Sequence, residues 1–374
     1  MGKTIKLTLL IFTLFICSSP NVVKAEDYTQ LDEYDFSDVE DILSDSLGDV
    51  EIDFYETVKK VISGESDSVF EELFVLIINK IFSQVSSQKN ILGSIIMIAV
   101  MAAFFSNFTS VLKNNSISET GFFAVYMLLI TLLIAGFKIS SDIASSVISS
   151  VLEFMGALMP AYFLSVGVIS GTTAVGFYEI TLMLITTVDW IYLNFIIPFV
   201  NIYVLISLVN NVSQEDYFSK TAEIIKTIID WTCKTVFATV LGINVIQSMI
   251  LPSVDLVKNG SLKKIIGAIP GIGNSAESVT EILLSSGILI KNGIGVVAVI
   301  FIIILCAVPV IKLIIITVMY KASAALVQPV SDKRITNCVD CVATATSVLL
   351  KTVLNVVFLF IITIAIICVS TNII

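Results

Sequence analysis

The chain is built from long apolar runs separated by short polar joints over most of its length. Several runs exceed the roughly 20 residues that cross the hydrocarbon core of a bilayer as an α-helix. The runs are continuous rather than alternating residue by residue, which excludes an outer-membrane barrel. The pattern therefore predicts an all-α fold, a polytopic helical membrane bundle of about seven to nine transmembrane segments. The segments come from the runs at 91–112, 120–139, 154–171, 176–210, 234–254, 294–327 and 347–370.

Two of the runs, 176–210 and 294–327, are longer than one crossing needs. Each contains a proline, Pro198 in the first and Pro309 in the second, and a proline inside a helix kinks it or divides it. The number of crossings in these two runs decides between seven segments and nine.

The number of crossings in these two runs also decides on which side of the membrane the later loops lie. If the N-terminus lies outside the cytoplasm, a single crossing at 176–210 places the lysine-rich loop 255–291 on the cytoplasmic side, as the positive-inside rule asks. Loop 328–346 also carries basic residues, but it then lies outside unless the run at 294–327 crosses twice. Both arrangements stay open.

The region before the first span has two parts. Residues 1–25 have the lysines, short apolar core and small-residue cleavage site of a secretory signal, with an uncleaved first helix as the alternative. Residues 26–89 are then an acidic extracytoplasmic region, and residues 90–374 form the transmembrane domain. Apolar residues keep helical spacing twice in the acidic region, and a capping box at Ser68 opens an amphipathic helix. The spaced residues are Val39, Ile42, Leu43 and Leu47, then Phe54, Val58, Val61 and Ile62.

The net charge of −10 is concentrated in the acidic region. Residues 1–25 carry +3, residues 26–89 carry −13, and residues 90–374 are neutral overall. A chain with this charge distribution is not suited to bind nucleic acid, whose phosphates need basic surfaces.

The remaining pattern centres on the stretch 263–295, which cannot be one plain helix if it lies at membrane depth. Glycines and a proline interrupt it, and lysines flank it. Irregular backbone at membrane depth occurs where it lines a path or is buried in protein. The alternative is a cytoplasmic loop with a helix on the membrane surface. The residues concerned are Pro270, Gly271, Gly273, Gly287, Lys291, Gly293 and Gly295.

Four ionisable residues lie in or beside the apolar runs: Asp189, Lys312, Glu179 and Glu153. A charge at membrane depth costs roughly 2.5–3.5 kcal/mol on insertion scales, so each is a candidate for a pathway or coupling role. Asp189 is the deepest, and we predict that it faces the bundle interior. The alternative is a structural or interfacial position, which the neighbouring Trp190 favours for Asp189.

No constellation for catalysis or cofactor binding is present. The chain has no histidine, and the one Cys-x-x-Cys pair, Cys338 and Cys341, has no second pair to complete a zinc site. The glycines near residue 270 lack the Lys-Ser/Thr of a phosphate-binding loop. We therefore expect no metal, no cofactor and no enzyme activity, with energy supplied by an ion gradient or a separate ATPase.

Three stretches resemble one known family: Ile-Pro-Gly-Ile-Gly at 269–273, Ser-Gly-Ile-Leu-Ile-Lys-Asn from 286, and Tyr-Lys-Ala-Ser-Ala-Ala-Leu-Val-Gln-Pro at 320–329. With the signal and the acidic region, they make the chain similar to the stage III sporulation protein AE family of endospore-forming Firmicutes. The resemblance implies a multi-pass protein of the mother-cell membrane around the forespore. It also implies a channel or secretion-like complex after engulfment, with a secretion-type ATPase, ring-forming proteins and a forespore membrane protein as partners.

Three functions fit these expectations. The first is a permease-like membrane component of that complex, with 263–295 along the path. The second is an assembly platform without a pore, and the third is a stand-alone ion-coupled transporter. Small residues in the spans, such as Gly156-Ala157, suit close helix packing and also an interface between copies of the chain.

Overall fold

In the computed structural model of the protein nearly all described residues are helical, and no strand occurs among them. The described residues are 31, 34–47, 53–63, 93, 97, 115–170, 172–212, 217–266, 273–329 and 333–370. The helices are α2 (Ser37–Leu47), α3 (Phe54–Ile62), α6 (Asn115–Ser170), α7 (Thr172–Ile191), η2 (Tyr192–Ile196), α8 (Ile197–Val212), α9 (Ser219–Ile266), α10 (Gly273–Val327) and α11 (Lys333–Ser370).

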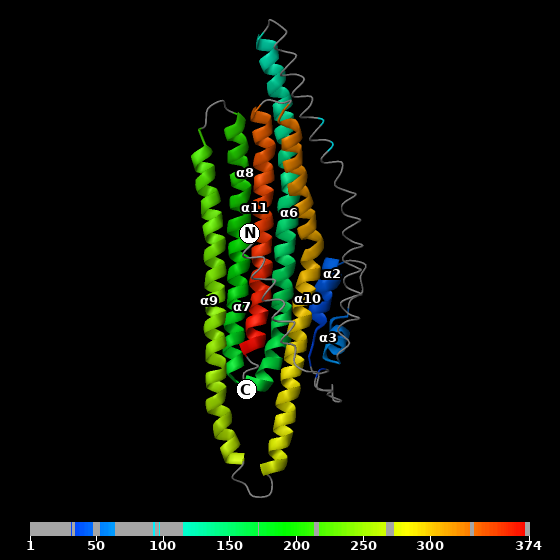
Figure 1. Ribbon diagram of the computed structural model, residues 1–374, viewed down its shortest axis with the longest axis vertical. Coiled ribbons are helices and arrows are strands. Elements are labelled where there is room, and N and C mark those ends of the chain that lie inside the picture. The colour runs from blue at the N-terminus through cyan, green and yellow to red at the C-terminus, as the bar shows by residue number, and fades with distance from the viewer. Residues whose placement is uncertain are drawn as a thin grey trace.

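The long helices stand side by side and run alternately up and down (Figure 1). Helices α7, η2 and α8 follow one another along a single rod. Helix α11 lies in the middle and packs against α6, α8, α9 and α10. Helix α9 stands at one edge, and the short helices α2 and α3 lie on the opposite side, against α6 and α10 (Figure 1). The side of the bundle at α10 is therefore covered by α2 and α3, whereas α9 forms the opposite edge.

Within the described residues, five helical segments are long and apolar enough to cross a membrane. The predicted count of seven to nine is not confirmed. Helix α6 is continuous from Asn115 to Ser170, so the predicted spans 120–139 and 154–171 are joined in one helix as far as Ser170. Helix α10 continues through Pro309, so the connections at its two ends lie at opposite ends of the bundle. Residues 1–25, the amphipathic helix from Ser68 and most of span 91–112 lie outside the described residues.

The bend expected at Pro198 takes a different form. A proline has no N–H to donate to the carbonyl of the residue four positions earlier. The helix here widens into a π-helical turn over Tyr192–Ile196, and the N–H of Ile197 donates to the carbonyl of Tyr192. The turn absorbs the misfit and lets the rod continue into α8, so Pro198 does not divide the segment.

The core between α6, α10 and α11 is filled with large side chains. The rings of Tyr126, Tyr162, Tyr320, Phe154, Phe301 and Phe360 are almost completely buried. These rings fill the space between the three helices at the heights where they lie.

The two helices predicted from apolar spacing in the acidic region are confirmed as α2 and α3. Phe54 of α3 lies between the rings of Phe154 and Phe301, with ring centroids 6.4 and 5.3 Å away. Glu40 of α2 accepts hydrogen bonds from the backbone N–H groups of Phe54 (3.1 Å) and Tyr55 (3.3 Å). Helices α2 and α3, which we call the acidic pair, are thereby held as a unit on the face formed by α6 and α10.

The expectation that Gly287, Gly293 and Gly295 interrupt the chain is wrong, because α10 is one helix from Gly273 onward. Two of these glycines permit close contacts instead. A Cβ at Gly293 would lie 2.6 Å from Cγ1 of Ile62 in α3, and a Cβ at Gly295 would collide with the sulfur of Cys368 in α11. Pro270 and Gly271 lie outside the described residues.

The packing at Gly295 can be tested with Gly295→Ala. The added methyl group must displace Cys368, so we expect the free energy of unfolding to fall by about 1–3 kcal/mol. Gly156→Ala is the matched control, because nothing lies within 4 Å of a Cβ at that helical position. We expect it to stabilise the protein by about 0.5–1 kcal/mol through helix propensity. Thermal unfolding in detergent measures both, and equal effects would contradict the packing.

Glu40 makes the docking of the acidic pair pH-dependent. Burial raises the pKa of the Glu40 carboxyl above its ordinary value of 4.5, so the docked state binds a proton more readily than the undocked chain. The stabilisation is fully present below about 4.5 and is lost as the pH rises through the raised pKa. We therefore expect tighter docking at pH 5 than at pH 8, measured as the urea midpoint of a fluorophore attached at Ser63→Cys.

Glu40→Gln keeps the acceptor oxygen but does not titrate, so it should remove the pH dependence. Asp41→Asn, at an exposed carboxylate of the same helix, should leave it unchanged. An unaltered pH dependence in Glu40→Gln would contradict the role of this carboxyl. Asp35 does not contribute in this range, because the hydroxyl and N–H of Ser37 lower the pKa of Asp35.

Candidate functional site: a polar seam inside the bundle

The most concentrated chemistry in the described residues lies between the outer helix α9 and the central helix α11. Polar side chains from both helices meet there at two heights, and Tyr192 joins them from the start of the π-helical turn. We call this set the polar seam. Its members are Tyr192, Cys233, Asn244, Gln247, Thr352, Asn355 and Thr363.

The first group of the seam is centred on Asn355 of α11. Its Nδ2 donates to the hydroxyl oxygen of Tyr192 at 2.6 Å and to the backbone carbonyl of Cys233 at 3.0 Å. One amide thus connects three helices, and the π-helical turn places the tyrosine ring within its reach. Because hydrocarbon offers no alternative partners, these bonds fix the positions of the three helices at this height.

The second group lies further along the same two helices. Nδ2 of Asn244 donates to Oγ1 of Thr363 at 2.7 Å, and the threonine hydroxyl donates to the carbonyl of Leu359 at 2.8 Å. Gln247 follows Asn244 on the same face of α9. Both amides are buried, but Oδ1 of Asn244 and Nε2 of Gln247 have no hydrogen-bond partner. A buried acceptor and a buried donor on the same face of α9 are therefore left without partners, which is costly unless another molecule binds them.

A separate buried contact joins α10, α11 and α6. Lys291 is fully buried, and its Nζ donates to the backbone carbonyl of Cys368 at 3.0 Å. The sulfur of Cys368 lies 3.0 Å from the hydroxyl of Tyr162. Since α11 ends at Ser370, the lysine satisfies a carbonyl in the last turn, where a helix favours positive charge. Lys291 was singled out as a flank of the interrupted stretch, and here it has a definite structural role.

The four ionisable candidates do not come together. Glu153 and Glu179 are exposed, and Glu153 accepts a hydrogen bond from the Ser149 hydroxyl at 2.7 Å. Asp189 and Lys312 are half-buried, on α7 and α10. None of the four forms an ion pair with another. The predicted interior position of Asp189 stays a prediction, although its neighbours Val188 and Tyr192 are buried.

The seam could have been found from the sequence by looking at neutral amides. Asn244, Gln247 and Asn355 lie within predicted spans, and the first two are three residues apart, on one face of a helix. Buried amides of this kind join helices inside membranes. Attention to ionisable residues alone missed them.

The cysteines and acidic residues of the described part do not form a metal centre. No group of three potential metal-binding side chains occurs there. Cys338 of the Cys-x-x-Cys pair lies 2.8 Å from the hydroxyl of Tyr126, so its thiol takes part in packing between α11 and α6. The site offers hydrogen-bond donors and acceptors rather than a nucleophile and a base.

Asn355→Leu tests the first group of the seam. The change leaves the Tyr192 hydroxyl and the Cys233 carbonyl without their shared donor, so we expect a loss of about 1–3 kcal/mol in unfolding free energy. Asn337→Leu, at an exposed position of the same helix, should change it by less than about 0.5 kcal/mol. Thermal unfolding in detergent compares the two. Equal stability of both variants would show that the amide does not hold the helices together.

Comparisons with known proteins agree with the resemblance noted from the sequence. Residues 52–371 match the stage III sporulation protein AE family. Stage III sporulation protein AE of Bacillus subtilis (strain 168) is 21% identical over 318 residues, which cover 84% of this chain and 80% of that protein. No solved structure matches the chain significantly. The family match takes in the five long apolar segments, the polar seam and Lys291 alike. The chain is therefore a multi-pass membrane protein of the stage III sporulation protein AE family.

Proposed function

We propose that the protein is a permease-like membrane component of a channel or secretion-like complex required during sporulation, after engulfment. It would act in the mother-cell membrane around the forespore, with its acidic N-terminal region outside the cytoplasm. The family and the five apolar segments support the setting. The polar seam is the observation that carries the permease-like part.

The seam supports a path because most of its polar side chains are buried, all are uncharged, and two of them are incompletely paired. Oδ1 of Asn244 and Nε2 of Gln247 lack partners in a part of the chain that is otherwise apolar. Side chains that are left in this state mark positions where water or a passing solute completes the hydrogen bonds. A fully structural seam would be expected to satisfy both atoms.

The placement of the seam also supports a path at α9 rather than at the bundle centre. The core between α6, α10 and α11 is filled by aromatic rings. Helix α9 stands at the edge, and its apolar segment is much less buried than that of α11. A small displacement of α9 from α11 would open the seam along its length without disturbing the aromatic core.

The platform function is favoured by a different observation, the docking of α2 and α3. Phe54, Val58 and Ile62 are buried against the bundle, while Asp38, Asp41 and Asp45 of α2 are exposed. A firmly held acidic surface outside the cytoplasm suits ring-forming partner proteins. We propose these proteins, a secretion-type ATPase, a forespore membrane protein and further copies of this chain as partners. We propose no enzyme activity for the protein.

Single cysteines in a cysteine-free variant distinguish the two functions. We expect cysteines at Val240, Asn244 and Gln247 to react with a small hydrophilic thiol reagent in sporulating cells. Asn244 and Gln247 belong to the seam, and Val240 is buried one helical turn before Asn244 on the same face of α9. Ala238→Cys on the exposed face of α9 and Phe360→Cys in the packed core are the controls, and both should stay unmodified. Protection of all three seam positions, in cells that still form spores, would refute the path and favour the platform.

A further inference from the structure

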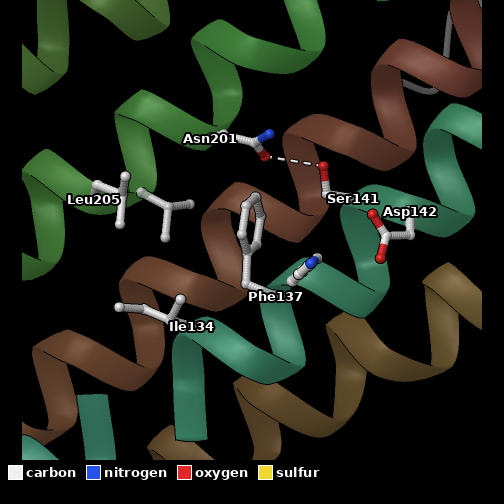
Figure 2. Close-up of a pocket in the computed structure, with 8 residues that line it drawn as sticks. Ile134, Phe137, Ser141, Asp142, Asn201 and Leu205 are labelled. Carbon is white, nitrogen blue, oxygen red and sulfur yellow. Dashed lines mark hydrogen bonds between the residues drawn. The ribbon is translucent and has the colours of Figure 1, made fainter. Parts of the chain in front are cut away.

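A cavity of about 260 Å³ lies between α6 and α8 (Figure 2). One end is apolar, at Ile134 and Leu205, and the buried ring of Phe137 lies in the middle. At the other end Oγ of Ser141 donates to Oδ1 of Asn201 at 2.9 Å. The cavity thus changes from apolar to polar along its length, and it shares no residue with the polar seam.

Two opposite charges line the polar end of the cavity. Lys138 and Asp142 are exposed side chains of α6, one helical turn apart, and neither forms an ion pair within the described residues. A pair at this spacing on an exposed helix surface contributes little to stability when it does form. A ligand that binds both charges at once therefore has little to displace.

The neighbouring helices carry further exposed charges at this level of the bundle. A Cβ at Gly136 would collide with the hydroxyl of Tyr320 in α10, and the next residue, Lys321, is exposed. On α11, Asp340 is exposed two residues after Cys338, whose sulfur contacts α6. Charges exposed on α6, α10 and α11 together are too costly for hydrocarbon. The cavity is therefore open to an aqueous solute and not to a lipid tail.

The apolar segment of α6 is long enough to leave this level outside the hydrocarbon. The segment Tyr126–Gly167 has 42 residues. At about 1.5 Å for each residue it extends over about 63 Å, whereas the hydrocarbon core is about 30 Å thick. Part of the segment must lie outside the hydrocarbon, and the charged turn at Lys138 and Asp142 marks that part.

The size and the lining of the cavity suit a small zwitterion with an apolar side chain. Its volume equals that of about nine water molecules, and a leucine molecule has about nine non-hydrogen atoms. Charges of opposite sign on adjacent turns suit a carboxylate and an ammonium group that are carried by one carbon atom. A phosphate or a metal cation would satisfy only one of the two charges, and each end of a peptide carries only one.

We propose that this cavity binds a free aliphatic amino acid of the leucine class. The carboxylate of the ligand pairs with Lys138 and its ammonium group with Asp142, while its side chain lies toward Ile134 and Leu205. Because the lining comes from both α6 and α8, a bound amino acid joins these two helices. The site includes neither the polar seam nor the acidic pair, so it does not depend on the proposed path.

The test uses the full chain in nanodiscs and measures ligand affinity by saturation-transfer NMR at pH 7. We expect leucine to bind more tightly than glycine, leucinamide or N-acetyl-leucine. Lys138→Gln should weaken leucine binding about five- to tenfold and leave leucinamide unchanged, because leucinamide has no carboxylate. Asp142→Asn should weaken leucine equally and leave N-acetyl-leucine unchanged, because its amine carries no charge. Leu205→Trp should abolish the binding of all these ligands by filling the apolar end.

Lys351→Gln is the matched control, because Lys351 is an exposed lysine inside another apolar segment and does not line the cavity. It should bind leucine as the parent does, and melting temperatures show that every variant is folded. No saturation by about 10 mM leucine, at which a millimolar site would be filled, would overturn the site. Equal affinity for leucine and glycine would overturn the apolar end. Equal losses for leucine and leucinamide in Lys138→Gln would overturn the pairing with the carboxylate.

Discussion

A polar side chain inside a helix bundle in hydrocarbon has no water to bind, so its partner must come from another helix. In this protein the central helix α11 provides most of these meeting points. Asn355 binds groups of η2 and α9, Thr363 accepts from α9, and the carbonyl of Cys368 accepts from α10. Since the three positions lie at different heights, they determine the rotation and depth of the helices around α11. Apolar packing then fills the spaces between them.

The glycines of α10 are explained by the same need of buried polar groups for partners on other helices. Lys291 reaches the last turn of α11 only if the two helices come close, and Gly295 removes the side chain that would keep them apart. On the other face, Gly293 admits Ile62 of the acidic helix pair. The stretch from Lys291 to Gly295 is thus a junction of α3, α6, α10 and α11. Its composition looks like that of a broken helix, but it serves contact rather than flexibility.

Apolar spacing alone was sufficient to predict α2 and α3, because a short helix on a protein surface has one apolar face and one polar face. It did not predict the number of long helices. The charged turn at Lys138 and Asp142 divides two apolar runs in the sequence, yet polar residues at helical positions do not end a helix. Local sequence contains no signal for this, because continuation depends on what neighbouring helices and the membrane surface offer to those side chains.

A polar region inside the bundle could be predicted from the sequence, but the residues that form it could not. A polar pathway was expected among ionisable residues and near the interrupted stretch, whereas the buried chemistry consists of amides, hydroxyls and one lysine. Asn244 and Asn355 are far apart in the chain, so only the packing of α9 against α11 shows that both belong to one seam. Glu153 and Glu179 were reasonable candidates from sequence. Their exposure shows that a charged residue in an apolar run can lie on the outside of a bundle that is longer than the membrane is thick.

The helices at the α10 side of the bundle are held by stronger contacts than helix α9 at the other side. This difference would let one chain have both a permease-like function and a platform function. On the α10 side, rings from α3, α6 and α10 pack together, and each large apolar side chain that the acidic pair removes from water contributes about 1.5–3 kcal/mol. On the α9 side, the hydrogen bonds of Asn244 and Asn355 add to the apolar contacts, and in membranes each hydrogen bond averages only about 0.6 kcal/mol. A force on the bundle would therefore move α9 first and leave the acidic surface in place. A pathway at α9 and a fixed docking surface at α2 and α3 are consequently compatible within one chain, because they use opposite sides of the same central helix.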